Sequence, residues 1–368
     1  MSITPIIQFG TSRFLQAHAD LFISDALKAG DAPGPICVVQ SSGDPARAHR
    51  LQALAAPEGY PVRVQGMVDG VEVSYETRAS AVKCTLSTAT DLTELQRRFV
   101  DEAEIVISNT GDAGWKPQPQ DDNAQFAQPM SFPAKLTHLL RARFEGGGRP
   151  IQIMPTELVA RNGEVLRDRV LQLAHALDPK FADWVASDVR FVNSLVDRIV
   201  SEPLEPAGAV AEPYALWAIE DCTGLILPAR HHAVQVVQDL DPVEKQKLHI
   251  LNLGHSYLVE GWLKRGRVRA EFVRDLMRDP TVRTDLEDLY QTEVLPGFQA
   301  AGLGDQASAY IRVTLDRFDN PFLEHKLEDI AGNHTEKCTR RIAAFIDWAQ
   351  AQGATHDMPR LSQVARRT

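Results

Sequence analysis

Several features that mark whole classes of proteins are missing from this chain of 368 residues. No run of about twenty apolar residues is present to span a bilayer. The opening segment MSITPIIQFG lacks the basic stretch and long apolar core of a signal peptide. Acidic residues outnumber basic ones, 49 to 39, whereas a nucleic-acid surface needs clustered Lys and Arg. We therefore expect a cytoplasmic protein with no membrane and no nucleic-acid partner.

Cysteine is also scarce, and its spacing excludes the common metal and redox motifs. None of the cysteines forms a C-x-x-C pair, so free thiols in a reducing compartment are the simplest interpretation. The sequence has no zinc signature, and His231-His232 is better interpreted as an exposed pair than as ligands. We expect no metal. The four cysteines are Cys37, Cys84, Cys222 and Cys338.

The length and the distribution of patterns predict two domains. Residues 1–240 alternate strand-like with helical patterns, which is typical of an α/β fold with a Rossmann-type dinucleotide-binding domain. Residues 241–368 are almost wholly helical in pattern, and we expect a mostly α-helical substrate-binding and catalytic domain there. Polar or glycine breaks interrupt this pattern at Arg265-Gly266, Arg278-Asp-Pro280 and Gly302-Leu-Gly304. The assembly is expected to be a monomer or a small homo-oligomer.

A strand, a glycine turn and a helix open the chain, as they do in a dinucleotide-binding fold. Residues 3–9 read as a short buried strand, and apolar residues then recur at helical spacing from Phe14 to Leu27. The free N–H groups of such a helix would face the pyrophosphate. The usual glycine pattern is reduced to Gly10, with Ser12 in the place of the second glycine, so the motif alone is weak evidence. The candidate cofactor-binding residues of this turn are Phe9, Gly10, Thr11, Ser12, Arg13 and Phe14.

Two further strand ends are expected to line the cofactor crevice. The strand at 35–40 ends in Gln40 and Ser41, where a fold that accepts NAD commonly has an acid for the ribose. Both can still hydrogen-bond a ribose, whereas the nearby Arg47 could tolerate a 2′-phosphate, so NAD is favoured and NADP stays open. The strand at 104–108 ends in small polar residues, for which a simple loop is the alternative. These are Ser108, Asn109 and Thr110.

Three shorter patterns complete the first half. Alternation on both sides of Asp69-Gly70 predicts a β-hairpin. Asn162-Gly163 follows the strand at 151–154 and is either an ordinary turn or a place where an amide donates to a developing alkoxide. Asp197 and Arg198 lie side by side in a strand-like segment, so they point to opposite faces and each needs its own partner.

One helix in the second half concentrates polar side chains. Asp241 is a good N-cap, Pro242 suits the first helical position, and Gly266 follows the expected end. At about 100° per residue, Lys247, Asn252 and His255 fall within an arc of roughly 140°. An amine, an amide and an imidazole would then share one face, with Gly254 among them to allow close approach. The alternative is that each of the three is structural or solvated.

A second patch lies nearer the end of the chain. Residues 316–321 are expected to be non-helical, and polar residues then recur every four positions. That spacing would stack the recurring residues along one helix face, for which a solvated face is the alternative. They are His325, Asp329, Asn333 and Lys337.

Taken together, the motifs resemble the mannitol dehydrogenase family of polyol dehydrogenases and keto-uronate reductases, and within it the keto-uronate, or tagaturonate-type, branch. The spacing of Lys247, Asn252 and His255 is specific to that family. The other matching segments are Phe9-Gly-Thr-Ser-Arg-Phe14, Ser108-Asn-Thr110 with Ala113-Gly114, Ser131-Phe-Pro-Ala-Lys-Leu-Thr137, Pro155-Thr-Glu-Leu158 with Asn162-Gly163, Leu195-Val-Asp-Arg-Ile-Val200, and Arg317-Phe-Asp-Asn-Pro-Phe322 with Asp329-Ile330 and Lys337.

The resemblance implies an NAD-dependent oxidoreductase that interconverts an aldonate, such as altronate or mannonate, and its keto form. It places the catalytic lysine on Lys247, the alkoxide-holding asparagines on Asn162 and Asn252, and the catalytic-site histidine on His255. No metal would be needed, because an amine and two amides stand in for a Lewis acid. Ser12 and Thr156 depart from the family pattern, where glycine and, in this branch, cysteine are usual.

A sugar acid also needs a cation for its carboxylate. Arg317 is the first candidate, with Lys337 or Arg198 as a second, because arginine binds carboxylates through two parallel bonds. A structural buried ion pair is the alternative for Arg198. Two other functions remain open: a dehydrogenase of neutral or phosphorylated polyols such as mannitol or arabinitol, and a non-catalytic nucleotide or sugar sensor.

Overall fold

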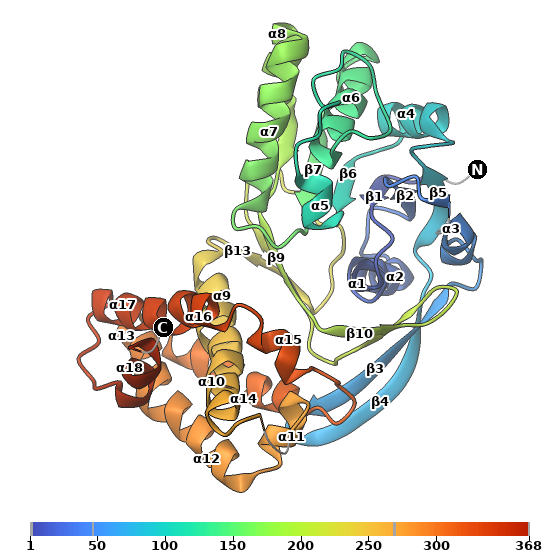
Figure 1. The fold of residues 1–368 in the computed structure, drawn as a ribbon. Coiled ribbons are helices and arrows are strands. Elements are labelled where there is room, and N and C mark those ends of the chain that lie inside the picture. Colours follow the sequence, from blue (N-terminus) through green and yellow to red (C-terminus); the bar gives the residue numbers. More distant parts are fainter. Residues whose placement is uncertain (1–2, 46–47, 268–269, 367–368) are drawn as a thin grey trace. The chain divides into compact units, whose positions relative to one another are not determined.

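A computed structural model of the chain describes residues 3–45, 48–267 and 270–366. The chain divides into two compact units. The first unit comprises residues 1–63, 76–211 and 215–240, and the second unit comprises residues 64–75, 212–214 and 241–368. Figure 1 gives the element labels used below.

A parallel sheet of six strands forms the centre of the first unit, in the order β5-β2-β1-β6-β7-β8 (Figure 1). Ile6 of β1 pairs with Ile36 of β2 on one side and with Ile105 of β6 on the other. Numbered along the chain, the six strands run 3-2-1-4-5-6, which is the order of a Rossmann fold, and the order reverses between β1 and β6. The predicted Rossmann-type domain is confirmed. The strands are β1 (Ile6–Phe9), β2 (Ile36–Gln40), β5 (Val82–Ser87), β6 (Ile105–Ser108), β7 (Ile151–Pro155) and β8 (Val189–Phe191).

These strands form because their runs of β-branched and aliphatic residues are buried on both faces, as in other parallel sheets. Ile7, Phe9 and Val106 belong to a cluster that also takes in Leu139 of α6 and Val170 of α7. The helices of this unit are α1 (Arg13–Gln16), α2 (Ala19–Ala29), α3 (Ala48–Leu54), α4 (Leu92–Asp101), α5 (Gly111–Trp115), α6 (Phe132–Glu145), α7 (Asn162–Leu177) and α8 (Pro179–Asp188).

The single helix expected from Phe14 to Leu27 is wrong, because the structure has two helices there. His18 separates α1 from α2 with φ −125° and ψ −99°, outside the helical region. Its ring stacks on Phe14, with centroids 4.7 Å apart, and its Nε2 lies 3.0 Å from the carbonyl oxygen of Leu216. Because Leu216 is 198 residues away in sequence, the local periodicity of residues 14–27 does not show the break.

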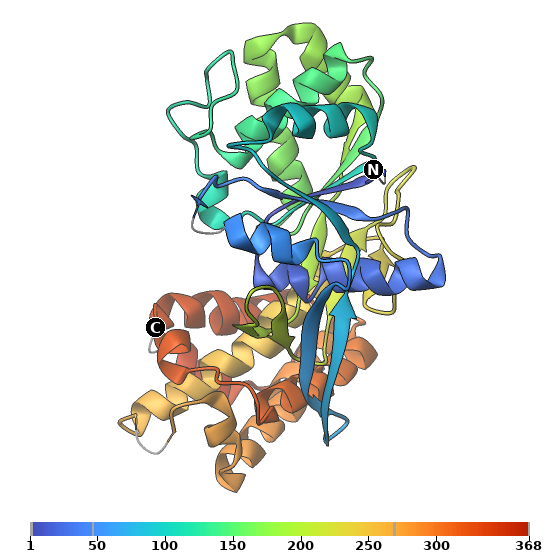
Figure 2. The ribbon, with the colours of Figure 1, turned by 90° about the vertical axis from the view of Figure 1, so that its right-hand side faces the viewer.

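Two smaller sheets complete the β structure. One has the order β10-β11-β3-β4 and contains the predicted hairpin, drawn in blue in Figures 1 and 2 as a long curved pair of strands. Asp69 and Gly70 both have positive φ, 51° and 75°, as a type I′ turn requires. The other sheet has the order β13-β12-β9. The strands are β3 (Tyr60–Val68), β4 (Val71–Ala79), β9 (Ser194–Asp197), β10 (Val200–Pro203), β11 (Ala209–Ala211), β12 (Leu216–Glu220) and β13 (Val234–Val237).

The second unit is helical apart from the hairpin tip, and its helices surround a core that includes Leu253, Leu286, Tyr290 and Phe345. All three predicted breaks are confirmed. The helices are α9 (Asp241–Gln246), η2 (Lys247–Asn252), α10 (Leu253–Lys264), α11 (Val273–Met277), α12 (Pro280–Leu289), η3 (Tyr290–Val294), α13 (Leu295–Ala300), α14 (Gly304–Asp319), α15 (Leu327–Ala331), α16 (His334–Cys338), η4 (Thr339–Ala343), α17 (Ala344–Ala351) and α18 (Pro359–Ala365).

Two local predictions in this unit are wrong. Residues 316–319 are helical, because α14 continues to Asp319 and ends only where Pro321 disfavours further helix. The run from His325 to Lys337 is not one helix. Asn333 adopts a left-handed conformation with φ 53°, which separates α15 from α16.

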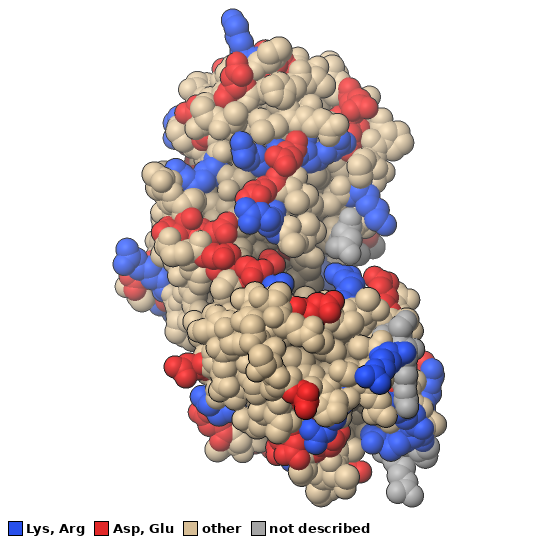
Figure 3. All heavy atoms as spheres, turned by 90° about the vertical axis from the view of Figure 1, so that its left-hand side faces the viewer, with Lys and Arg blue, Asp and Glu red and all other residues tan. Residues whose placement is uncertain are grey.

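The surface agrees with the acidic composition. On the face drawn in Figure 3, basic and acidic side chains are interspersed rather than gathered into a basic stripe. Cys37, Cys84, Cys222 and Cys338 are all free thiols, as predicted. Within the described ranges, no helix is both long and apolar enough to cross a membrane.

Candidate active site

Lys247 and Asn252 occupy the two ends of a π-helical turn, η2, between α9 and α10. The N–H of Leu253 donates to the carbonyl of Leu248, five residues earlier. Such single-turn π segments inside α-helices occur frequently at functional sites. Because a π turn holds more residues than an α turn, residues five apart lie more nearly above one another than an α-helix would place them.

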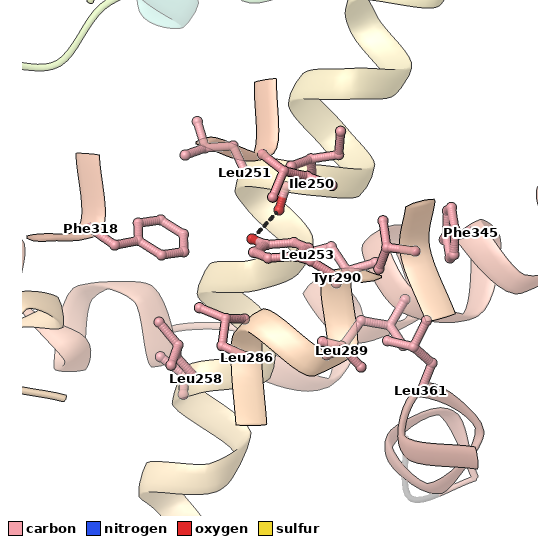
Figure 4. Close-up of a cluster of buried hydrophobic side chains, with 14 of the residues drawn as sticks. Ile250, Leu251, Leu253, Leu258, Leu286, Leu289, Tyr290, Phe318, Phe345 and Leu361 are labelled. Atoms are coloured by element: carbon pink, nitrogen blue, oxygen red, sulfur yellow. Dashed lines mark hydrogen bonds between the residues drawn. The ribbon is translucent and has the colours of Figure 1, made fainter. Parts of the chain in front are cut away.

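A tyrosine from another helix supports this turn (Figure 4). The buried hydroxyl of Tyr290 donates a hydrogen bond of 2.9 Å to the carbonyl oxygen of Ile250. A Cβ atom added at Gly254 would lie 2.0 Å from the same hydroxyl oxygen, so only glycine lets α10 and Tyr290 approach this closely. The close neighbour expected beside Gly254 is therefore a side chain of the protein. Burial raises the pKa of Tyr290, so the hydroxyl stays protonated and able to donate.

His255 follows one turn later, on α10, and is buried, whereas Lys247 and Asn252 are half-buried. Its ring centroid lies 4.5 Å from that of Phe318 and 4.7 Å from that of His325. Its Nε2 has no hydrogen-bond partner among the described residues. The pKa of His255 is well below its usual value, first because of burial and then because His325 and the cations Arg317, Arg341 and Lys337 lie near. The imidazole is therefore neutral near pH 7.

Arg317, the first candidate for the carboxylate of a substrate, already holds a carboxylate of the protein. Its Nε and Nη2 donate to the two oxygens of Glu212 at 3.0 and 2.8 Å, and both side chains are almost fully buried. Its guanidinium also lies over the ring of Tyr214, 4.7 Å from the centroid. Arg317 lines a cavity of about 190 Å³ in the second unit, but Glu212 already balances its charge there.

The other two candidate cations differ from each other. The Nζ of Lys337 donates to the carbonyl of Ile330 at 2.8 Å, and burial lowers the pKa of this lysine. Arg198 belongs to the first unit, is buried, and donates from Nη1 to the carbonyl of Ala17. The role of Arg198 in substrate binding stays a prediction.

Asn162 opens α7 in the first unit, where its side chain organises the backbone. Its amide nitrogen donates to the carbonyls of Pro155, Glu157 and Ser194 at 2.9–3.1 Å, and its oxygen accepts from the N–H groups of Gly163 and Ser194. Before Asn162 could donate to an alkoxide, at least one of these bonds would have to break.

The carboxyl edge of the central sheet carries the predicted cofactor residues. Gly10 has φ 126°, and a Cβ there would lie 2.5 Å from the carbonyl oxygen of Asn109, so glycine is required where β1 and β6 approach. Ser12 caps α1 by accepting from the N–H of Leu15 at 3.3 Å, and its hydroxyl lies 3.4 Å from Asn109 Oδ1. Thr11, Ser12, Asn109 and Thr110 are half-buried polar groups at the point where the strand order reverses, and they fit a dinucleotide.

Glu157 links residues at the same edge of the sheet. The sequence shows Glu157 only as part of a family motif and predicts no such role for it. One oxygen of its buried carboxylate accepts from the hydroxyl of Ser108 at 2.9 Å. The other accepts from the N–H and the hydroxyl of Thr110 at 2.9 and 3.2 Å. Glu157 therefore ties the end of β7 to the end of β6. No local sequence signal reveals this, because the partners are 47 and 49 residues apart.

A lysine lies at the end of β2, where the sequence lacks the usual acid. The Nζ of Lys135 donates to the carbonyl of Ser41 at 2.5 Å, and burial lowers its pKa to about 8. Gln40 uses its amide to bond the carbonyl of Asp44 at 2.8 Å, so Ser41 is the more available of the two predicted ribose ligands. Arg47 lies outside the described residues. Across the described part of the chain, no group of three or more His, Cys, Asp or Glu side chains is placed to hold a metal ion.

Solved structures share this fold. A substrate-free D-sorbitol dehydrogenase superposes with a TM-score of 0.82 at 22% identity, covering 98% of this chain and 79% of the other. Mannitol 2-dehydrogenase of Pseudomonas fluorescens, solved with NAD and D-mannitol, superposes with a TM-score of 0.73 at 22% identity, covering 99% and 78%.

Sequence relatives extend the likeness. The altronate oxidoreductase of Bacillus subtilis strain 168 is 31% identical over 375 residues, and that of Yersinia pestis is 29% identical over 384 residues. Each alignment covers 95% of this chain and 76% of the relative. The Rossmann domain of mannitol dehydrogenases matches residues 4–226, and their C-terminal domain matches residues 239–363. The chain therefore belongs to the mannitol dehydrogenase family and is an oxidoreductase that acts on CH–OH groups.

Proposed function

We propose that this enzyme is an NAD-dependent oxidoreductase that interconverts an aldonate, of the altronate or mannonate type, and its keto form. The observation that carries the proposal is the π turn with Lys247 at one end and Asn252 at the other, followed within one helical turn by His255. The substrate class is supported by relatives that are altronate oxidoreductases and by the cationic side chains around His255.

The protein groups have separate tasks in the proposed reaction. The amine of Lys247 accepts the proton of the secondary hydroxyl as a general base. The amide of Asn252 donates to the oxygen on which negative charge develops, an interaction worth about 3 kcal/mol at comparable oxyanion sites. His255, neutral near pH 7, orients the hydroxyl by a hydrogen bond. When bound, the oxidised nicotinamide supplies the acceptor for the hydride that leaves the carbinol carbon.

No metal enters this scheme, because the amine removes the proton and the amide stabilises the alkoxide, the two tasks that a Lewis acid would otherwise combine. Asn162 is the second alkoxide donor implied by the family, and its present bonds to backbone carbonyls make it the less available of the two asparagines. The coenzyme groups proposed are those around Gly10, Ser41 and Asn109.

A substrate panel tests the proposal. Purified enzyme is mixed with NAD⁺ and, in turn, D-altronate, D-mannonate, D-mannitol and D-arabinitol, and NADH absorbance is followed. We expect turnover of at least one acid and little of the polyols. Turnover of the polyols alone would overturn the proposed substrate class, and binding of coenzyme without any turnover, repeated with NADP⁺, would favour a sensor.

Replacement of the base is the second test. Lys247→Ala should lower kcat by about 10²–10⁴ while coenzyme affinity, measured by calorimetry, stays within twofold. Lys245→Ala is the matched control, because Lys245 lies on α9 just before the π turn and pairs loosely with Asp241 at 3.9 Å. Retained turnover in the Lys247 variant would refute the role.

A further inference from the structure

Two cations of the second unit lie four residues apart on one continuous run of α16 and η4, Lys337 and Arg341. That spacing places them on the same face. Arg341 donates from Nη1 to the hydroxyl of Ser256 at 3.1 Å and approaches the carbonyl of Asn252 at 3.4 Å. It is thus anchored to the helix that carries His255, directly after the π turn.

Neither cation forms an ion pair within 4 Å among the described residues, although the carboxylate of Asp329 lies near enough to Lys337 to raise its pKa. Neighbouring basic groups do: Arg340 pairs with Glu336 on the exposed face at 3.7 Å, and His334 pairs with Glu260 at 3.0 Å. The Nε and Nη2 groups of Arg341 donate to no described protein atom, which leaves part of its five-donor fork available. Burial lowers the pKa of both Lys337 and Arg341, because the charged form of each side chain loses part of its hydration. A bound anion would offset this loss of hydration free energy.

Unpartnered polar atoms point to the same place. Within the described part of the chain, the Nε2 of the buried His255 and the Nδ1 of His325 both lack a hydrogen-bond partner. The charged groups that act on His255 are Arg317, Arg341 and Lys337, and none is an acid. Glu212 already balances Arg317, and the carboxylate of Asp329 lies near enough to raise the pKa of Lys337. The positive charge without an acidic neighbour among the described residues is therefore that of Arg341, with Lys337 as a partly compensated second cation.

We propose that Lys337 and Arg341 form a subsite for the carboxylate of the substrate, beside Asn252 and His255. The inference rests on the proposed sugar-acid function and transfers the carboxylate-binding role from Arg317 to Arg341. The guanidinium suits a carboxylate because it offers two parallel N–H donors, and the ammonium of Lys337 adds a second charge. A substrate whose hydroxyl lies at the Asn252 amide would then present its acid end to the arginine that contacts the Asn252 carbonyl.

A purely structural role is the competing interpretation. Lys337 bonds the carbonyl of Ile330 near the end of α15, as a basic residue that caps a helix does. Arg341 bonds Ser256, which could be helix packing alone. These roles would affect acidic and neutral substrates equally, whereas a carboxylate subsite would not.

The test compares Arg341→Gln and Lys337→Gln with Arg340→Gln, the matched control on the outer face. kcat and KM are measured with NAD⁺ for the acid that the wild type oxidises best and for D-mannitol, and binding of the acid is measured by calorimetry. We expect Arg341→Gln to raise KM for the acid 10- to 100-fold and Lys337→Gln about tenfold, at nearly unchanged kcat. These changes correspond to the usual strength of a charge-assisted hydrogen bond. Arg340→Gln should match the wild type.

The outcomes separate the two proposals. If the wild type oxidises polyols alone, the proposed function fails and the subsite fails with it. If the wild type oxidises acids but Arg341→Gln leaves their KM unchanged, or weakens acid and polyol equally, the subsite alone is overturned. Arg341→Lys keeps the charge without the fork. Should Arg341→Gln not fold, an intermediate KM in the lysine variant supports the subsite, and a wild-type KM overturns it.

Discussion

The guanidinium of Arg317 and the carboxylate of Glu212 form a two-bond ion pair, 2.8 and 3.0 Å long, in the interior of the second unit. Removing one partner of such a pair leaves a buried charge uncompensated. We expect Glu212→Gln to lower the free energy of unfolding by about 3–5 kcal/mol, measured by urea denaturation.

The double variant Glu212→Leu with Arg317→Met is the control for that experiment, because an apolar pair of similar volume is often neutral. It should recover most of the stability lost in Glu212→Gln. Unchanged stability in Glu212→Gln would contradict the structural interpretation and return Arg317 to the role of substrate ligand.

The close contact between Gly254 and Tyr290 predicts that a change at one residue can compensate for a change at the other. Gly254→Ala places a Cβ 2.0 Å from the tyrosine hydroxyl, so it should displace Tyr290, release the carbonyl of Ile250 and disturb the π turn. We expect a loss of about 1–3 kcal/mol of stability together with a fall in kcat. Adding Tyr290→Phe removes the clashing oxygen and should restore part of the stability, as seen in thermal melts.

In that series Tyr290→Phe alone reports on the hydrogen bond. Its expected cost is about 1–3 kcal/mol, because the carbonyl of Ile250 stays buried without this partner. If kcat falls in Tyr290→Phe while coenzyme affinity holds, the π turn matters for catalysis. If the two variants are additive in stability, the residues do not interact as the structure indicates.

Asp20 predicts a pH dependence of stability in the first unit. Burial is the main cause that raises its pKa from 3.8 to about 7, against the lowering effect of a 2.5 Å hydrogen bond from Tyr60. Between these pH values the folded protein binds a proton that the unfolded chain has lost, so stability falls as pH rises from about 4 to about 7, by roughly 1.4 kcal/mol per pKa unit.

Asp20→Asn tests this because an amide cannot ionise. The variant should be more stable than the wild type at pH 8, and its free energy of unfolding should lose that part of the slope between pH 4 and 7. Asp25→Asn, on the same helix but only half-buried, is the control and should keep the wild-type slope. A wild-type slope in Asp20→Asn would show that another group carries the dependence.

Replacing Asn162 should lower the stability of the protein by more than the loss of a single hydrogen bond would. Asn162→Ala removes an amide that serves three carbonyls and two backbone N–H groups, and buried groups left unpaired cost about 1–3 kcal/mol each. We expect a clear drop in melting temperature. A folded variant with wild-type stability and strongly reduced kcat would instead support the alkoxide-donor role.

Much of the fold followed from local pattern. Buried β-branched runs, glycine turns and 3.6-residue periodicity predicted the parallel sheet, the hairpin at Asp69-Gly70 and the breaks at Gly266, Pro280 and Gly304. Each of these depends on residues adjacent in sequence, whose conformational preferences act without distant partners. The spacing of Lys247, Asn252 and His255 likewise predicted that one helical segment carries all three residues, and their catalytic roles come from the family resemblance and stay a proposal.

The tertiary structure decided the features that depend on distant partners. Tyr290 donates a hydrogen bond to the π turn from 40 residues away in sequence. Glu212 forms an ion pair with Arg317 from 105 residues away. His18 interrupts the first helix through a contact with Leu216, and Glu157 joins two strand ends. The charge balance around His255 likewise emerges only when Lys337 and Arg341 pack against its helix. Local sequence determined where most of the strands and helix breaks lie, because those preferences act between neighbouring residues. Packing determined which polar groups are already satisfied, because a buried polar atom takes whatever partner the fold brings to it.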